Sequence, residues 1–242
     1  MPRGSCRERR SNRRRVRSRA LSAVSRAVRS ARARLNAPAP RHVGRTQAAT
    51  TLGAVLVGGA SSRFGSDKAS AHYQGRTMLD NALDVLSAAG LQHLAYVGGA
   101  PRDTTRHAAH VPDLASLPDE RCALRGVVSA LHAVLPPLQQ AVIIACDLPL
   151  LRAETVARLI AALDASEAVV AHGERDHWSC VAFRVDALPH LEASLARGRR
   201  AMHDACADMR LARVQVEESE FANVNTRSAL DEVITKHAGG RE

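Results

Sequence analysis

Residues 52–68 decide the fold of this chain, and they read Leu52-Gly53-Ala54-Val55-Leu56-Val57-Gly58-Gly59-Ala60-Ser61-Ser62-Arg63-Phe64-Gly65-Ser66-Asp67-Lys68. The apolar run at 52–57 predicts a buried strand, and the two glycines after it predict a loop. Downstream, apolar periodicity predicts helices at 77–89, 124–135 and 153–163 and strands at 94–97, 141–146 and 168–171. Apolar strands that alternate with helices indicate an α/β fold with a mostly parallel sheet that is buried on both faces.

The loop after the first predicted strand has the composition of a phosphate-binding loop. Glycines such as Gly58 and Gly59 let backbone N–H groups approach phosphate oxygens. Arg63 and Lys68 supply positive charge for a polyphosphate. The stretch matches neither the Walker A pattern nor the dinucleotide pattern G-x-G-x-x-G. The alternative is a glycine-rich turn between a strand and a helix that carries surface charges.

Two aspartates follow apolar segments and are candidates for the same site. Asp147 comes directly after the predicted strand 141–146, at the sheet edge where open α/β folds bind ligands, and a carboxylate there suits Mg²⁺. Its alternative role is the N-cap of the next helix. Asp113 could accept the ring N–H and amino group of guanine. Its alternative role is a loop residue that starts a turn.

The basic character of the chain belongs to its N-terminal part. Residues 1–45 hold 15 arginines and one acidic residue, whereas residues 46–242 hold 19 basic and 23 acidic residues. We therefore expect a basic, disordered tail at 1–48 and a folded domain at 49–238. The tail could be an arm that binds RNA or a membrane surface, an organellar transit peptide, or an upstream extension that the protein does not need. We favour the extension.

Cysteine spacing and hydropathy indicate a cytoplasmic protein. The five cysteines, at 6, 122, 146, 180 and 206, include no C-x-x-C pair, so reduced thiols are expected rather than disulfides or a zinc site. No apolar stretch approaches 18 residues, so no transmembrane helix is expected. The N-terminus lacks the apolar run of a secretory signal.

The loop pattern G-G-x-x-x-R-x-G-x-D-K after a strand resembles the signature of nucleotidyltransferases with the nucleotide-diphospho-sugar transferase fold. Within that superfamily the chain most resembles the molybdenum cofactor guanylyltransferases, over about residues 52–233. The further segments that carry this resemblance are Gly75, Val111-Pro112-Asp113, Leu124-x-Gly126, Cys146-Asp147-x-Pro149, Gly173-Glu174-Arg175-Asp176-His177 and Phe221-x-Asn223-Val224-Asn225-Thr226.

The resemblance implies a three-layer α/β/α Rossmann-like fold and transfer of GMP from GTP to molybdopterin. It implies Arg63, Lys68 and Asp147 as catalytic residues, with Asp147 holding Mg²⁺. The nucleotide site it implies comprises Leu56, Val57, Gly58, Gly59, Arg63, Lys68, Gly98, Asp113 and Asp147. The acceptor site it implies comprises Arg175, His177, Arg200, Asn223 and Asn225. Molybdoenzyme maturation proteins are further expected partners, whereas a membrane and nucleic acid are not.

Several alternatives remain open on the sequence alone. Asn223 and Asn225 also suit a turn before a helix capped by Thr226 or Ser228. The arginines and the histidine of the acceptor site could equally be exposed side chains that bind nothing. Arg121–Gly126 stands where relatives usually carry Gly-Pro-Leu-x-Gly, and the strand ending at Gly98 lacks an asparagine that some relatives use near the base. A cytidylyltransferase of molybdopterin, or of another phosphorylated acceptor, is therefore the main rival. An inactive domain with an Arg-rich nucleic-acid-binding arm is the second.

Overall fold

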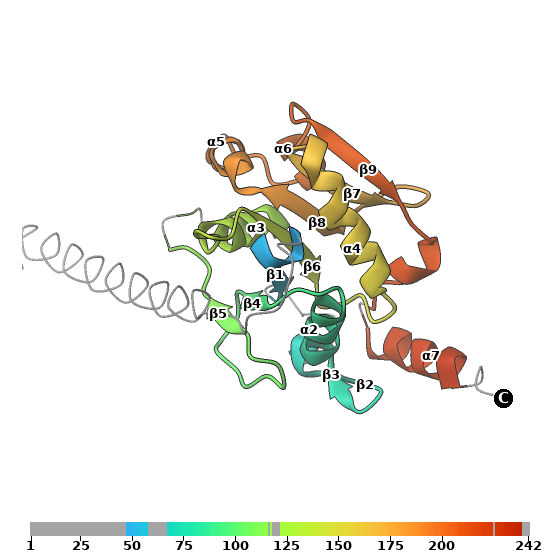
Figure 1. Ribbon diagram of the computed structural model, residues 1–242. Coiled ribbons are helices and arrows are strands. Elements are labelled where there is room, and N and C mark those ends of the chain that lie inside the picture. The colour runs from blue at the N-terminus through green and yellow to red at the C-terminus, as the bar shows by residue number, and fades with distance from the viewer. Residues whose placement is uncertain (1–46, 58–66, 116, 118–121, 225, 239–242) are drawn as a thin grey trace, which may run out of the picture.

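The computed structural model describes residues 47–57, 67–115, 117, 122–224 and 226–238. Seven strands form one sheet in the order β5–β4–β1–β6–β8–β7–β9 (Figure 1). Within this sheet, the described strand pairs are parallel except the two that involve β8, so the predicted mostly parallel α/β sheet is confirmed. The strands are β1 Thr51–Leu56, β4 His93–Val97, β5 Ala109–Val111, β6 Gln140–Ala145, β7 Ala168–His172, β8 Asp176–Arg184 and β9 Leu211–Gln215.

Helices cover both faces of the sheet and produce three layers. Alternate strand residues explain this arrangement: Ala54 and Ile143 point into one apolar core, and Val55 and Ile144 point into the other. One core is closed by α3 Ala123–His132, α5 Leu188–Ala196 and α6 Met202–Ala205, and the other by α2 Met78–Ala88 and α4 Ala153–Ala162. The sheet is therefore buried on both faces, as its continuous apolar strands predicted.

Local signals placed the helix boundaries closely. Thr77 caps α2, because its hydroxyl oxygen accepts the backbone N–H of Asp80 at 3.0 Å. Gly90 follows the helix with a φ of +91°, which glycine adopts without strain. Helix α3 ends at His132, three residues before the predicted end at Leu135. Leu135 directly precedes Pro136, a position that disfavours the helical conformation.

Smaller elements complete the described chain. The hairpin of β2 (His72–Tyr73) and β3 (Arg76–Thr77) precedes α2, and α7 (Arg227–Ala238) lies at its side (Figure 1). Tyr73 of the hairpin and Leu230 of α7 belong to a third, small apolar cluster. The 3₁₀ helices are η1 Gln47–Thr50, η3 Lys68–Ser70, η4 Leu163–Ala165, η5 Val185–Ala187 and η6 Glu218–Phe221.

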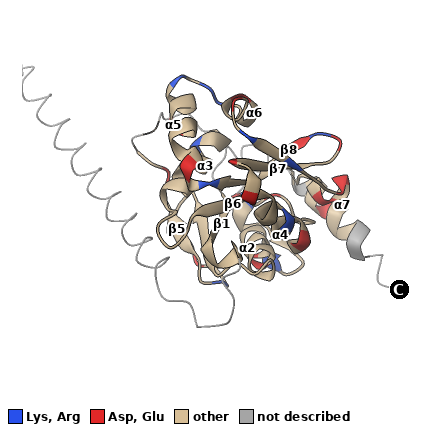
Figure 2. Ribbon diagram, turned by 45° about the horizontal axis from the view of Figure 1, so that its top comes forward, with Lys and Arg blue, Asp and Glu red and all other residues tan. Residues whose placement is uncertain are grey.

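Charges of both signs lie on the helices and loops, while the central strands β1 and β6 carry none (Figure 2). The tail predicted at 1–48 lies outside the described residues except for its last two positions. Within the described chain, no helix combines the length and the apolar character that crossing a bilayer requires.

Candidate active site

The carboxyl ends of four parallel strands bring most of the predicted nucleotide-binding residues to one edge of the sheet. Backbone hydrogen bonds continue the pairing just past the strands: Val57 N–H donates to Val97 at 3.0 Å, and Gly98 N–H donates to Val111 at 2.9 Å. Asp147 follows β6, which lies beside β1 on its other side. Val57, Gly98 and Asp147 therefore meet at one edge, which is where open α/β sheets bind ligands. The predicted residues Gly58, Gly59 and Arg63 lie outside the described residues.

Lys68 and Asp147 form an ion pair at this edge. The Lys68 Nζ lies 2.8 Å from Oδ2 of Asp147, and the two side chains are only 13% and 17% exposed. Lys68 is the first residue of η3, whose N-cap is Asp67. A strand end and a short helix that are 79 residues apart in the sequence thus place opposite charges in direct contact.

Asp147 has the features of a metal ligand. Its second oxygen, Oδ1, is buried and has no hydrogen-bond partner, and a buried carboxylate oxygen is costly unless a donor or a cation satisfies it. Helix α4 begins at Ala153 with Arg152 as its N-cap, so the alternative role of Asp147 as a helix cap is wrong. Within the described chain, no group of three or more His, Cys, Asp and Glu side chains gathers to hold a metal. One carboxylate with a free oxygen suits Mg²⁺, which takes its other ligands from phosphates and water.

Gly98 and Asp113, both predicted to bind the nucleotide, lie just beyond the neighbouring strands β4 and β5. Gly98 has a φ of +84°, a conformation that a side chain would strain. The imidazole Nε2 of His110, on β5, lies 3.3 Å from the Gly98 carbonyl oxygen and 3.2 Å from that of Gly99. These two contacts tie the turn to β5. Asp113 is half-buried in the loop two residues beyond β5. Both residues follow strands that end at the same edge.

The C-terminal segment reaches Asp147 through the backbone. The N–H of Val224 donates to the carbonyl oxygen of Asp147 at 3.1 Å, which brings the exposed Asn223 close to the ion pair. Asn225 lies outside the described residues. Thr226 caps α7 by accepting the N–H of Ala229 at 3.2 Å, so the helix cap foreseen at Thr226 or Ser228 is at Thr226.

His177, predicted to bind the acceptor, lies on strand β8, and its partners within the protein belong to η6. Its side chain is 5% exposed, its Nε2 lies 2.9 Å from Oε2 of Glu218, and its ring stacks on Phe221 with centroids 4.1 Å apart. Hydrogen bonds from the Glu174 N–H and from His177 hold the pKa of the Glu218 carboxyl below its ordinary value. His177 therefore anchors η6, which leads directly to Asn223.

The two arginines predicted for the acceptor are more accessible. Arg175 is exposed in the turn between β7 and β8. Arg200 is half-buried after α5, and its Nη1 donates to the carbonyl oxygens of Leu195 at 3.1 Å and Arg199 at 3.3 Å. None of the described contacts joins either arginine to Lys68 or Asp147.

Three charged residues with defined partners received no role of their own in the sequence analysis. Glu220 is 3% exposed and accepts hydrogen bonds from Arg152 and Thr155 at the start of α4. Asp67 and Arg102 form an ion pair beside Lys68. Asp67 stands in the quoted loop pattern and carried a signal, whereas Glu220 and Arg102 are each one charge among several in a polar stretch.

Comparisons of the sequence with known proteins identify its relatives. A family model described as a MobA-like NTP transferase domain matches residues 53–213. The molybdenum cofactor guanylyltransferase of Xanthomonas euvesicatoria pv. vesicatoria (strain 85-10) is 30% identical over 190 residues, covering 72% of this chain and 89% of the relative. The enzyme of the same name from Rhizobium johnstonii is 30% identical over 187 residues, covering 74% and 82%.

Solved structures share the fold. The molybdopterin-guanine dinucleotide biosynthesis protein A from Archaeoglobus fulgidus has a TM-score of 0.62 at 19% identity, covering 78% of this chain and 99% of that one. The 4-diphosphocytidyl-2C-methyl-D-erythritol synthase from Anaerococcus prevotii has a TM-score of 0.60 at 13% identity, covering 79% and 97%. The family model alone spans well over half of the sequence, so the chain belongs to the family of MobA-like NTP transferases.

Proposed function

We propose that the protein transfers GMP from GTP to the phosphate of molybdopterin or the molybdenum cofactor and releases pyrophosphate. The observation that carries this proposal is the pair of Lys68 and Asp147 at the carboxyl edge of the sheet. In the sequence, Lys68 follows the glycine-rich segment 58–65. The names of the relatives at 30% identity support guanine as the base and the molybdenum cofactor as the acceptor.

The reaction is an in-line displacement at the α-phosphorus of GTP. An oxygen of the acceptor phosphate forms a new bond to that phosphorus, and the bond to the oxygen that bridges the α- and β-phosphorus breaks. Because a phosphate nucleophile is already an anion near neutral pH, no general base is needed. Catalysis then consists of positioning and charge neutralisation. In our proposal Gly58 and Gly59 cradle the phosphates, while Arg63 and Lys68 neutralise the departing pyrophosphate.

A covalent enzyme intermediate is not part of this mechanism. Cys146, the thiol next to Asp147, is buried, and this burial raises its pKa to about 12. A thiol with so high a pKa is protonated at neutral pH and is a poor nucleophile.

Mg²⁺ fits the site through Asp147. The unpartnered Oδ1 of Asp147 would hold the ion together with phosphate oxygens of the nucleotide. When bound, Mg²⁺ supplies positive charge against the phosphates. Lys68 already neutralises the other carboxylate oxygen, so the pair can serve the ion and the leaving group together.

We assign base recognition and acceptor binding to opposite sides of this centre. Leu56, Val57, Gly98 and Asp113 line the base side, and the half-buried carboxylate of Asp113 suits the paired N–H donors of guanine. The acceptor side comprises Arg175, His177, Arg200, Asn223 and Asn225. For His177 we propose an indirect part, through its contacts with Glu218 and Phe221.

We further propose that the reaction takes place in the cytoplasm, with molybdoenzyme maturation proteins as partners that receive the product. The four described cysteines are all free thiols, as is usual in a reducing compartment.

The experiment that tests the function combines binding and transfer. The full chain is mixed with Mg²⁺ and each of GTP, CTP, ATP and UTP, and its melting temperature is measured. A nucleotide present at a hundred times its dissociation constant stabilises by about 2.7 kcal/mol, or roughly 5–11 °C for a domain of this size. GTP, Mg²⁺ and molybdopterin are then incubated with the protein, and the dinucleotide product and pyrophosphate are quantified.

Controls separate the alternatives. Asp147→Asn keeps the size of the side chain but removes its charge, so it should abolish metal-dependent transfer. A melting shift and product with CTP alone would assign the chain to cytidylyl transfer. No shift with any nucleotide, and no product, would refute the proposal. A variant that lacks residues 1–48 should retain transfer; nucleic-acid binding lost with those residues from an otherwise inactive protein would instead favour the Arg-rich arm.

A further inference from the structure

The loop between β4 and β5, residues 98–108, is fastened at its middle by Tyr96. The hydroxyl of Tyr96 donates to the carbonyl oxygen of Arg102 at 3.0 Å and accepts the N–H of Arg102 at 2.9 Å. The ring of Tyr96 stacks on His110, with centroids 5.0 Å apart. The backbone of Arg102 is thus clamped from both sides, which fixes where its side chain starts.

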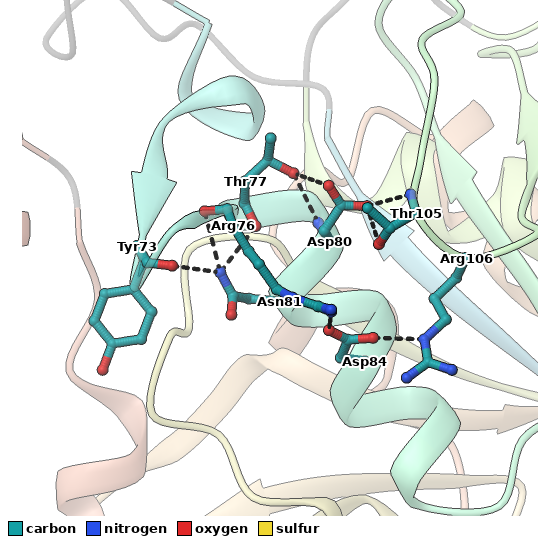
Figure 3. A network of polar contacts seen from close by, with 8 residues as sticks. All are labelled: Tyr73, Arg76, Thr77, Asp80, Asn81, Asp84, Thr105 and Arg106. Carbon is teal, nitrogen blue, oxygen red and sulfur yellow. Dashed lines mark hydrogen bonds and ion pairs between the residues drawn. The ribbon is translucent and has the colours of Figure 1, made fainter.

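A second set of contacts ties the far half of this loop to helix α2 (Figure 3). The buried carboxylate of Asp80 accepts the N–H and the hydroxyl of Thr105 at 2.7 and 2.9 Å. Arg106 donates to Asp84 at 2.5 Å, one turn along the same helix. These contacts anchor the loop to α2, and none of them involves η3.

The side chain of Arg102 instead reaches the helix that carries Lys68. Its Nη1 lies 2.5 Å from Oδ2 of Asp67, and the Arg102 side chain is 19% exposed. The carboxylate of Asp67 also accepts the Ala69 N–H at 3.2 Å and the Ser70 hydroxyl at 3.0 Å, and so caps η3. Arg102 therefore contacts the cap of the element whose first residue pairs with Asp147.

The turn at the start of the loop leaves room for this guanidinium. A Cβ atom at Gly99 would lie 2.9 Å from Nη2 of Arg102, closer than non-bonded atoms approach. Gly99 also has a φ of +61°. Gly99, which follows the proposed base-side residue Gly98 in this turn, therefore lies directly against Arg102.

We propose that Arg102 is a positioning residue that couples the Gly98–Gly99 turn to Lys68 through Asp67. Helix η3 has three residues, and only two backbone hydrogen bonds close its turns, Ser70 to Asp67 and Ala71 to Lys68, each at 3.1 Å. So short an element owes its orientation to its cap rather than to its own hydrogen bonds. By holding the cap, Arg102 orients Lys68 toward Asp147 and toward the phosphates.

The position of Lys68, rather than the stability of the fold, is what this contact controls. Asp67 is 47% exposed, and ion pairs with an exposed partner contribute little to folding. A displacement of about 1 Å of a catalytic group, in contrast, lowers rates by about 100-fold. The kinetic part of the inference rests on the proposed guanylyl transfer, whereas its structural part does not.

The test uses the full chain with four single variants. Arg102→Ala removes the contact and Arg102→Lys restores a positive charge. Asp67→Asn keeps a capping oxygen but loses the ion pair. Arg106→Ala is the matched control, because it removes the other arginine that ties this loop to its surroundings. Hydrogen exchange of the backbone amides at 69–71 is measured at short labelling times, and kcat and KM for GTP are measured by product formation.

In the expected result, Arg102→Ala and Asp67→Asn both accelerate exchange at 69–71 and lower kcat by about 10- to 100-fold, with KM for GTP changed less than about twofold. Arg102→Lys recovers part of the loss, Arg106→Ala changes neither readout, and the double variant of Arg102 and Asp67 is no worse than either single one.

Two results would overturn the inference. One is exchange at 69–71 in Arg102→Ala that equals the wild type. The other is a raised KM with unchanged kcat, which would mean that Arg102 binds the nucleotide itself. If the wild-type chain transfers no guanylyl group, the proposed function fails, but the exchange measurement still decides whether Arg102 holds η3.

Discussion

Glu220→Ala should lower the free energy of unfolding by about 3 kcal/mol, because it removes a buried carboxylate that organises the start of α4. Glu220 is 3% exposed. Its Oε2 accepts the Thr155 hydroxyl at 2.7 Å and the Arg152 N–H at 3.1 Å, and its Oε1 accepts Arg152 Nη2 at 2.6 Å. The carboxylate thus connects the N-cap residue Arg152 to Thr155 in the first turn of α4, where Arg152 itself provides no side-chain cap.

The magnitude follows from which of these donors is buried. Thr155 is 2% exposed, so its hydroxyl loses its acceptor without gaining water. The hydrogen bonds from the Thr155 hydroxyl and from the Arg152 N–H go to an ionised group, and at about 1.5 kcal/mol each they give about 3 kcal/mol. The Arg152 side chain is 57% exposed and becomes hydrated when the carboxylate is removed. Arg152→Ala should therefore cost much less than Glu220→Ala.

The loss should also depend on pH. Burial alone raises the pKa of Glu220, but hydrogen bonds from the Arg152 side chain, Thr155 and the Arg152 backbone outweigh it and lower that pKa. A lowered pKa in the folded state means stabilisation that is complete above the pKa of the unfolded chain, about 4.3, and is lost as pH falls through the folded value. The difference between wild type and Glu220→Ala should therefore be constant near neutral pH and shrink below about pH 4.

Urea unfolding followed by circular dichroism measures the effect, with the exposed neighbour Glu217 replaced by alanine as the control. A loss of about 3 kcal/mol corresponds to a melting temperature about 6–12 °C lower. The reasoning is refuted if Glu220→Ala and Glu217→Ala unfold alike, or if Arg152→Ala is as destabilising as Glu220→Ala.

Three further predictions concern the site and the core. Lys68→Ala should fold but lose roughly 100- to 1,000-fold in kcat for guanylyl transfer, and a variant with unchanged turnover would remove Lys68 from the mechanism. Gly53→Ala should cost about 1–3 kcal/mol in urea unfolding, because a Cβ there would lie 2.9 Å from Cδ1 of the buried Leu91; full stability would show that the core yields. Burial alone raises the pKa of Asp80, but hydrogen bonds from threonine side chains and the Thr105 N–H outweigh it and lower that pKa. Asp80→Asn should therefore cost about 1–2 kcal/mol near pH 7 and less below about pH 4, and a pH-independent loss in the same unfolding assay would contradict this.

Local patterns were enough to predict the strands and helices that flank the site. The apolar run at 52–57 is strand β1 at Thr51–Leu56, and Thr77 and Gly90 bound α2 as their chemistry predicts. These features depend on neighbouring residues, because a cap, a turn or an apolar period is defined within a few positions.

The sequence also predicted Lys68 and Asp147 in one site, because Asp147 follows one predicted strand, Lys68 closes the loop that follows another, and the carboxyl ends of parallel strands share an edge. It could not give their direct contact at 2.8 Å. That distance depends on how η3 packs against the end of β6. An element of three residues is too short to show an apolar periodicity, so its position cannot be predicted from the sequence.

The tertiary structure alone decided the antiparallel place of β8 between β6 and β7, the stacking of His177 on Phe221, and the partners of Glu220 and Arg102. Each of these contacts joins residues at least 35 positions apart, or strands whose direction the apolar pattern leaves undefined. A charged residue shows its type in the sequence but not its partner. The partner is chosen when burial of the apolar faces fixes the strand order, and the polar side chains must then satisfy one another wherever that packing has brought them.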